Sequence, residues 1–450
     1  MENEEIERTI EQTVQRYQEH VDPGLGFYMQ ATLGDVVEWE AHGNEVRDMR
    51  GQTWYDALSF MGVFGIGHRH PKVVQAVRDQ LDRMPMNARY FFNKPQSDLA
   101  ARLIEIAPQR SVKNVFFSNS GSEAVDVALK CAKFTTGRQE IISTVESYHG
   151  VTVGAVAVSG MRHFREGIEP LLPGVRFIPF GDVSALDAIT EKTAGIIIEP
   201  VHAGLGSKMA PPGYFAALRE RCDRTGAIFI DDEVQTGLGR TGKLWGIDHH
   251  PGVAPDIICM GKVLSGGVMP LGATLYSERV ADAISKRLIF NTSTFGGGEM
   301  ACAAGLAAVN VIVEEDLAGQ AARGGEVLGA ELRAVAQRFP NIIKEVRGVG
   351  MMWTIEFSDW LASFFVFPQM IREHRILVAP HLNRIDMIRI SPALNARHED
   401  LVRVGQALGA SLASYRELDA SSREAYEYAF KQALKNSVEK SQLEESGFVQ

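Results

Sequence analysis

The chain has 450 residues, 45% hydrophobic and 23% charged, a composition that is ordinary for a globular protein large enough for more than one domain. Its formal net charge is -10, and no stretch gathers the lysines and arginines of a nucleic-acid surface, so no nucleic-acid partner is expected. The four cysteines form no CxxC pair, which excludes a cysteine-rich zinc site, argues against a disulfide framework and fits a cytoplasmic location.

The first twenty residues are acidic and have the apolar periodicity of a helix. They lack the basic start and apolar block of a signal peptide, so export is not expected. Asp22-Pro23-Gly24 ends this helix, and the segment to about Ala57 alternates polar and apolar residues as small hairpin strands do. The most apolar stretch, 301–313, is too short to span a bilayer and predicts a buried helix, so no membrane contact is expected.

From about Phe60 to Val313, short apolar runs alternate with segments of helical period, which predicts an α/β domain with a doubly wound parallel sheet. The expected helices are 71–81 and 97–107, and the expected strands are 115–117, 141–142, 175–180, 195–198, 228–230 and 257–258. After about Glu315 the pattern predicts a smaller α+β domain. Its expected elements are a helix through Leu328 and Leu332, strands near 351–357, 376–379 and 387–390, and a helix over 398–412.

These changes of pattern divide the chain into four parts. Residues 1–60 are a helix and hairpin segment that belongs to the small domain, 61–315 are the large domain, and 316–416 complete the small domain. Residues 417–450 are a charged tail with sparse aromatics, which is expected to be a surface helix or partly disordered.

A first candidate binding element lies in Asn114 to Lys130, where a strand is followed by Ser120-Gly121-Ser122-Glu123 and a helix. Ser120 and Glu123 have the spacing of a capping box. A helix that starts just past a buried strand offers free backbone N–H groups and a positive dipole end to a phosphate. An ordinary capped helix without a ligand is the alternative for this motif alone.

A second candidate follows the apolar run 227–230, where Asp231 and Asp232 precede Glu233-Val234-Gln235. Ligands of α/β sheets bind at the carboxyl ends of the strands, and a carboxylate there can hold the protonated nitrogen of a pyridine ring. Two other interpretations stay open for this motif, a metal pair made of Asp231 and Asp232 and a helix cap.

The segment Gly237 to Lys243 matches GxGxxG and most of a phosphate-binding P-loop. Leu244 stands where a P-loop needs a serine or threonine for magnesium, and the residues after it form no amphipathic helix. We therefore expect neither a dehydrogenase nor a nucleotide triphosphatase.

Lys262 follows the apolar run 257–260 and is bordered by glycines. Partial desolvation in such a turn lowers the pKa of a lysine and frees its amine as a nucleophile for a carbonyl, although a surface lysine is the alternative. Tyr148 is able to stack on a planar ring or to pack in the core. His68-Arg69-His70 has no carboxylate nearby in sequence, and a loop is preferred there to a metal site.

Taken together and in this order, the motifs resemble the class III aminotransferases of the ornithine and ω-amino acid type, which depend on pyridoxal 5′-phosphate (PLP). The resemblance extends from about Asp22 to Leu412. Its most specific blocks are 119–124, 148–150, 199–200, 232–237, 239–242, 255–262 and 293–297. It implies the fold type I architecture, with a mainly parallel seven-stranded sheet in the large domain and a smaller α+β domain.

The resemblance also implies how PLP is bound. Gly121 and Ser122 would bind its phosphate, while Tyr148 and Val234 would pack on the two faces of its ring. The implied cofactor site further includes Ser120, His149 and Glu199.

The residues expected to carry the chemistry come from the same resemblance. Asp232 would pair with the pyridine nitrogen, Gln235 would hydrogen-bond near the phenolic oxygen, and Lys262 would hold the cofactor as a Schiff base. Thr294 would reach the phosphate in the neighbouring subunit, so a homodimer is expected, with a tetramer as the alternative. Arg389 would bind a substrate carboxylate, and a surface ion pair is the alternative for this residue.

Two departures from the family pattern are visible. Relatives that use glutamate as donor carry a glutamate that covers the arginine, and Gly204 stands at that place here. Gly298-Glu299 replaces the usual Asn-Pro after the paired glycines. The layout of the chain is most similar to putrescine (diamine) aminotransferases, notably in the segments 21–24, 171–174 and 266–274.

The expected function is therefore transfer of an amino group from a small amine or ω-amino acid, with a diamine as first guess, to a 2-oxo acid such as pyruvate or 2-oxoglutarate. The order of events would be ping-pong, and no metal is expected. The runner-up is a PLP-dependent racemase or decarboxylase on the same scaffold, which the loss of a glutamate at Gly204 allows. A ligand sensor without activity is the remaining alternative.

Overall fold

The apolar runs of the chain form a seven-stranded sheet in the part that this computed structural model describes, residues 3–88 and 90–437. In spatial order its strands are β4 (Asn114–Ser118), β12 (Gly272–Tyr276), β11 (Ile257–Met260), β10 (Ile228–Asp232), β7 (Thr193–Ile198), β5 (Glu140–Thr144) and β6 (Val175–Ile178). Neighbours from β11 to β6 are parallel, whereas β12 pairs antiparallel with both β11 and β4. The predicted α/β class with a mainly parallel seven-stranded sheet is confirmed.

One strand of this sheet, β12, is not marked by a long apolar run in the sequence. It consists of Gly-Ala-Thr-Leu-Tyr and begins directly after a glycine-rich turn. Small residues are required at its start, since a Cβ atom on Gly272 would come within 2.1 Å of the Ser120 carbonyl oxygen. Close packing beside the start of α6 (Gly121–Thr136), which is distant in sequence, therefore hides the usual signature of a strand.

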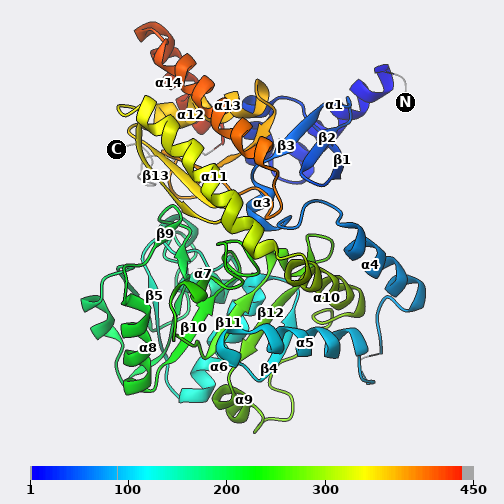
Figure 1. Cartoon of the computed structure of the whole chain (residues 1–450), viewed down its shortest axis with the longest axis vertical. Helices are drawn as coiled ribbons and strands as arrows, with labels where there is room; N and C mark the ends of the chain where they lie inside the picture. Colours follow the sequence, from blue (N-terminus) through cyan, green and yellow to red (C-terminus); the bar gives the residue numbers. More distant parts are fainter. Residues whose placement is uncertain (1–2, 89, 438–450) are drawn as a thin grey trace.

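Helices cover the sheet, as a mainly parallel sheet requires. α6 (Gly121–Thr136) packs on β7, β10, β11 and β12, and α8 (Tyr214–Thr225) contacts β10. α10 (Glu299–Glu314), the predicted buried helix, packs against α4 (Pro71–Arg83) and α5 (Lys94–Ile106) in the lower half of Figure 1. α5 begins earlier than predicted because the Asn93 side chain accepts a hydrogen bond from the Gln96 N–H and so caps the helix.

The upper half of Figure 1 contains the second lobe of the molecule. Its antiparallel sheet has the order β13 (Ile343–Val349), β14 (Met352–Phe357), β17 (Met387–Ile390) and β16 (Ala379–Pro380). α11 (Leu317–Arg338) packs on β13 and on α13 (His398–Arg416), which in turn packs on α12 (Trp360–Arg372). β13 escaped prediction because charged residues interrupt its apolar positions.

The N-terminal segment joins this second lobe. β1 (Glu38–His42), β2 (Glu45–Asp48) and β3 (Thr53–Asp56) form a hairpin sheet, and β3 pairs in parallel with β15 (Ile376–Leu377). This pairing supports the assignment of residues 1–60 to the small domain, although the exact division of the chain stays a prediction.

Residues 23–33 correct one expectation for the N-terminal segment. α1 (Asn3–His20) ends where predicted, but α2 (Pro23–Leu33) follows at once in place of a hairpin strand. The Asp22 side chain accepts a hydrogen bond from the Leu25 N–H, and Pro23 occupies the first helical position. Both features are helix-start signals, so Asp22-Pro23-Gly24 begins a new helix as well as ending the first.

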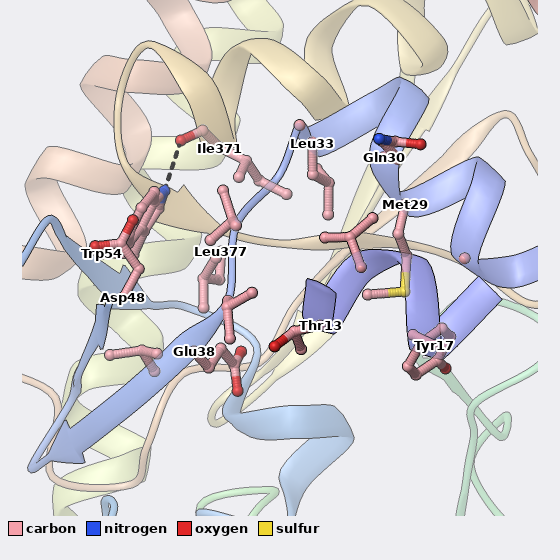
Figure 2. Close-up of a pocket in the computed structure, with 16 residues that line it drawn as sticks. Thr13, Tyr17, Met29, Gln30, Leu33, Glu38, Asp48, Trp54, Ile371 and Leu377 are labelled. Atoms are coloured by element: carbon pink, nitrogen blue, oxygen red, sulfur yellow. Dashed lines mark hydrogen bonds between the residues drawn. The ribbon is translucent and has the colours of Figure 1, made fainter. Parts of the chain in front are cut away.

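A cavity of about 310 Å³ lies between α1, α2, the hairpin sheet and α12. Figure 2 shows its largely apolar lining, which includes Met29, Leu33 and Leu377. At one side the Trp54 indole N–H donates a hydrogen bond of 3.0 Å to the Ile371 carbonyl oxygen, which ties the hairpin to α12. This cavity shares no lining residue with the polar cavity at the ends of the large-domain strands.

The charged tail begins as a helix. α14 (Ala420–Ser437) contacts α2 and α12, and residues 438–450 lie outside the described residues. Across residues 3–88 and 90–437, every helix is too short or too polar to cross a membrane.

Candidate active site

The carboxyl ends of five strands of the large sheet open on one cavity of about 190 Å³. Loops at these ends lie at a single edge of the sheet, because the strands concerned run in the same direction. The cavity is lined by Gly121, Ser122, Tyr148, His149, Gly150, Glu199, Asp232, Val234, Gln235 and Lys262. Of the predicted site residues, Ser120, Thr294 and Arg389 are absent from this lining.

The start of α6 forms one wall of the cavity. The Ser120 hydroxyl accepts a hydrogen bond from the Glu123 N–H at 3.2 Å, while the Glu123 carboxylate accepts one from the Asn119 N–H at 3.0 Å. These contacts fix the helix start and leave the first-turn positions Gly121 and Ser122 at the cavity. Helix starts of this kind bind anions through their backbone N–H groups.

Gly121 is required at this wall by its neighbours. A Cβ atom on Gly121 would lie 2.8 Å from a methyl carbon of Val234, and a Cβ atom on Gly261 would lie 3.2 Å from the α-carbon of Gly121. The helix start, the end of β10 and the turn after β11 therefore approach more closely than side chains would permit.

Asp232 is held in place at the end of β10 by two contacts. Its Oδ2 lies 2.6 Å from Nδ1 of His149, and its Oδ1 accepts a hydrogen bond from the Val234 N–H at 3.1 Å. Both side chains are buried. The second ring nitrogen of His149, Nε2, is buried and has no hydrogen-bond partner among the described residues.

Asp231 points to the other face of β10, since successive side chains of a strand alternate. It does not line the cavity. Burial, together with the neighbouring Glu233 and Asp232, raises the pKa of Asp231 well above the ordinary value. The open interpretation of Asp231 and Asp232 as a metal pair is thus wrong, because the two carboxyl groups do not face one site.

Lys262 lies directly after β11 at the start of a short turn, Lys262–Ser265. Its φ angle is +47°, a left-handed conformation that is uncommon for a lysine and is held here by the packed turn. Burial lowers the pKa of Lys262 to about 8, with Arg389 and Arg240 acting in the same direction and Asp232 opposing it. A large share of this amine is therefore neutral near pH 8 and available as nucleophile or base.

Glu199 and Gln235 complete the polar lining. The Glu199 carboxylate accepts hydrogen bonds from the N–H groups of Tyr148 at 3.2 Å and Ala203 at 3.1 Å, and burial raises its pKa. The Nε2 atom of Gln235 is buried without a partner among the described residues. Buried polar atoms of folded proteins are nearly always satisfied, so these unpaired donors at the cavity are consistent with a polar ligand.

The set of residues fits the PLP that the sequence leads us to expect. The helix start at Gly121 and Ser122 suits its phosphate, and the Asp232 carboxylate suits a protonated ring nitrogen. The unpaired Gln235 amide suits an oxygen on the ring, and the partly neutral Lys262 suits its aldehyde.

Arg389 lies on β17, close to the cavity but outside its lining. It is buried, with 6% of its surface exposed, which excludes the surface ion pair. Its guanidinium contacts the Met61 sulfur at 3.3 Å and His381 Nδ1 at 3.5 Å, and its Nε has no partner in the described part of the chain. Burial lowers the pKa of Arg389, and Glu199 opposes this shift.

Gly204 stands where the family pattern has the glutamate that covers this arginine, and its surroundings leave no room for a side chain. A Cβ atom there would lie 1.8 Å from the Glu146 carbonyl oxygen, so this backbone admits no side chain. The Asn383 amide holds the loop by donating to the Glu146 carboxylate at 2.5 Å and to the Gly204 carbonyl at 3.1 Å.

The Gly237 to Lys243 segment forms turns and no helix, as expected. Arg240 within it is buried and donates to the carbonyl oxygens of Met351, at 2.9 Å, and Pro392, so it ties the large domain to the small one. Burial lowers the pKa of Arg240 to about 10. Sequence reasoning missed this role, and it also missed Met61 and His381.

Two further predicted positions lie elsewhere. His68 bonds to the Asp56 carboxylate at 2.8 Å, and no group of three or more metal-binding side chains occurs among residues 3–88 and 90–437. Thr294 is exposed in the loop before α10.

Comparison with known proteins gives a consistent result. A family model described as Aminotransferase class-III matches residues 30–412. An ornithine aminotransferase from Toxoplasma gondii is 30% identical over 85% of this chain and 91% of its own, with a TM-score of 0.80. A PLP-bound amine transaminase from an uncultivated Pseudomonas species is 31% identical over 84% and 95%, with a TM-score of 0.78. An (S)-enantioselective omega-transaminase from Thermomicrobium roseum is 27% identical over 90% and 98%, with a TM-score of 0.82.

Proposed function

Since the chain belongs to the class-III aminotransferases, which are PLP-dependent enzymes, we propose that it moves an amino group from a small amine or ω-amino acid to a 2-oxo acid in two half-reactions. The observation that carries this proposal is the cavity at the strand ends. It brings a helix start, the carboxylate of Asp232 and the partly neutral amine of Lys262 together.

Each part of the cavity has one task in the proposed site. The first turn of α6, at Gly121 and Ser122, binds the phosphate, with the Ser120 cap fixing the turn. Tyr148 and Val234 pack against the two faces of the ring. Asp232, oriented by His149, holds the proton on the ring nitrogen. Bound PLP with a protonated ring withdraws electrons from the substrate carbon that bears the amino nitrogen.

Lys262 moves the proton in this scheme. Its Nζ would take the proton from the donor carbon that bears the amine and, as the conjugate acid, would hold that proton for its later return. The lowered pKa of about 8 keeps enough of the amine neutral to act as the base. In the second half-reaction, Lys262 moves a proton in the opposite direction while Arg389 holds the carboxylate of the 2-oxo acid.

A half-reaction screen tests the function. The purified holoenzyme is mixed with single amines and ω-amino acids, a diamine included, and the loss of cofactor absorbance is followed; pyruvate or 2-oxoglutarate is then added to restore it. Bleaching by a donor and recovery with a 2-oxo acid support the proposal. Racemised or decarboxylated product formed without any 2-oxo acid would instead establish the alternative chemistry.

Arg389→Ala is expected to impair the 2-oxo acid half-reaction selectively. Loss of a buried, charge-assisted contact to a carboxylate costs about 2 kcal/mol, roughly thirtyfold in kcat/KM. A donor amine without a carboxylate should react at nearly the wild-type rate. Stopped-flow absorbance measures both half-reactions separately. Arg389→Lys is the matched control, which keeps the charge but lacks the planar fork and should lose less; an unchanged 2-oxo acid reaction in Arg389→Ala would remove the arginine from the site.

A homodimer is part of the same proposal. Large apolar side chains are strongly exposed in two segments of the large domain, namely Tyr90, Phe91, Phe92, Leu288, Ile289 and Phe295. Exposed apolar surface of this size marks a protein interface, and the exposed Thr294 lies in the second segment. Sedimentation distinguishes this dimer from a tetramer.

Mixed dimers are expected to show that Thr294 acts across the interface. Thr294→Ala should weaken PLP affinity, because a hydroxyl contact to the phosphate is lost. In a dimer of one Thr294→Ala and one Lys262→Ala subunit, the only site with Lys262 receives Thr294 from its partner and should regain normal affinity. Titration of PLP into each species measures this, and a failure to recover would place the threonine contact within its own chain.

We also propose a cytoplasmic location. All four cysteines are buried thiols, and burial raises the pKa of Cys131 to about 11 and that of Cys222 to about 12. Thiols of this kind need no disulfide partner and are typical of a reducing compartment. Cell fractionation tests this assignment.

A further inference from the structure

Arg389 has a neutral partner where a carboxylate would be expected. Its Nη2 lies 3.5 Å from Nδ1 of His381, a long hydrogen bond, and the guanidinium makes no ion pair in the described part of the chain. The opposite nitrogen of His381, Nε2, lies 3.1 Å from the Thr354 hydroxyl, which lies 3.0 Å from the Ser207 hydroxyl. All four side chains are buried.

The sheet of the small domain builds this row. Arg389 on β17 is paired with Thr354 on β14 and with Ala379 on β16. His381 follows β16, and its N–H donates to the Met387 carbonyl oxygen at 3.1 Å. Three adjacent strands thus fix the imidazole beside the guanidinium, while Ser207 connects the row to the large domain.

The direction of the hydrogen bonds follows from the donors available. A guanidinium can only donate, so Nδ1 of His381 must accept from Arg389. The proton of the neutral ring then resides on Nε2 and is donated to the Thr354 hydroxyl, which also shares a hydrogen bond with the Ser207 hydroxyl. Burial keeps the pKa of His381 well below its ordinary value, and the cations Arg389, Arg347 and Arg384 act in the same direction.

We propose that His381 is a positioning residue that orients Arg389 without neutralising it, so that the guanidinium meets every substrate with no carboxylate bonded to it. This inference rests on the proposed function, in which Arg389 binds the 2-oxo acid. A carboxylate partner would have to be displaced by each carboxylate substrate and would cover the arginine for every other substrate. An imidazole acceptor imposes neither condition.

The consequence concerns the class of donor. Burial is the main cause of the lowered pKa of Lys262, and the charges around this lysine oppose one another, Asp232 and Glu199 against Arg389 and Arg240. Arg389 itself carries a positive charge that no carboxylate contacts in the described part of the chain. A second ammonium on the donor would add to this positive charge, whereas a carboxylate would be attracted by it. The site therefore favours an ω-amino acid over a diamine of the same chain length, which narrows the first guess made from the sequence.

Three substitutions separate positioning from mere packing. In His381→Asn the amide oxygen can replace Nδ1 toward Arg389, in His381→Gln the longer side chain reaches only toward Thr354, and in His381→Leu both contacts are lost. Stopped-flow measurements on the holoenzymes give rate and half-saturation for the 2-oxo acid that the wild type accepts, and for a donor without a carboxylate. Melting temperature and cofactor absorbance show that each variant is folded and loaded.

We expect His381→Leu and His381→Gln to raise the half-saturation for the 2-oxo acid about tenfold, with the limiting rate and the simple-amine reaction nearly unchanged, and His381→Asn to remain near wild type. Rescue by glutamine and not by asparagine, or no change in the leucine variant, would overturn the inference. If the leucine variant does not fold, the asparagine and glutamine pair decides.

A matched pair of donors tests the consequence on the wild type. 4-Aminobutanoate and 1,4-diaminobutane have the same carbon chain and differ in the charge of the distal group. We expect a higher kcat/KM for the amino acid, and a preference for the diamine would overturn the charge argument. Absence of reaction with any donor or 2-oxo acid would instead count against the proposed function, so the two failures are distinguishable.

Discussion

Lys262→Ala is expected to abolish transamination while PLP still binds without a covalent bond. The lysine supplies both the nucleophile for the aldehyde and the base that moves the proton, and a general base alone contributes about 10² to 10⁴ in rate. The remaining lining, including the helix start at Gly121 and the Asp232 carboxylate, does not depend on the amine. We therefore expect the loss in kcat without loss of the cofactor.

The measurement combines steady-state turnover with the absorbance spectrum of the reconstituted variant, in which the band of the lysine-bound cofactor should be missing. Lys133→Ala is the matched control. Lys133 is a partly buried lysine of α6, its pKa is also lowered by burial, and it does not line the cavity. It should retain wild-type turnover, and turnover in Lys262→Ala near that of the control would remove Lys262 from its role.

Much of the large domain could be predicted because each buried strand is marked by the residues of its own short segment. A strand covered on both faces needs a continuous apolar run, and the runs at β7, β10 and β11 are of this kind. β12 could not be recognised from the sequence, because its first residue must be small to pack against the Ser120 backbone, which is distant in sequence. α2 was missed although Asp22 and Pro23 carry its signal, because the same residues also read as the end of α1.

The candidate site divides in the same way. Its lining residues follow strand ends directly, so their convergence at one edge of the sheet follows from parallel topology. The environment of Arg389 does not follow from the topology of the sheet, because Met61 and His381 contact this arginine from segments that share no motif or spacing with it. The choice between Asp231 and Asp232 also required the structure, since it depends on which face of β10 borders the cavity.

Asp232→Asn is expected to lower kcat by roughly a hundredfold to a thousandfold, the usual effect of removing one preorganised electrostatic group from an active site. The carboxylate keeps the ring nitrogen protonated, and an uncharged amide of nearly the same shape does not. The contact with His149 Nδ1 at 2.6 Å orients the carboxylate, so the substitution also removes the charge to which the imidazole is bonded.

Asp231→Asn provides the matched control on the neighbouring residue. The side chain of Asp231 faces away from the cavity and its pKa is raised well above the ordinary value, so an amide of nearly the same shape leaves the cavity lining unchanged. We expect this variant to keep kcat within a fewfold of wild type, with any effect confined to stability through its neighbour Glu233. Steady-state rates and thermal melting of both variants check the pair. Comparable losses of kcat in both variants would contradict a specific role for the Asp232 carboxylate at the ring nitrogen. A loss of kcat in Asp231→Asn alone would mean that Asp231, and not Asp232, pairs with the ring nitrogen.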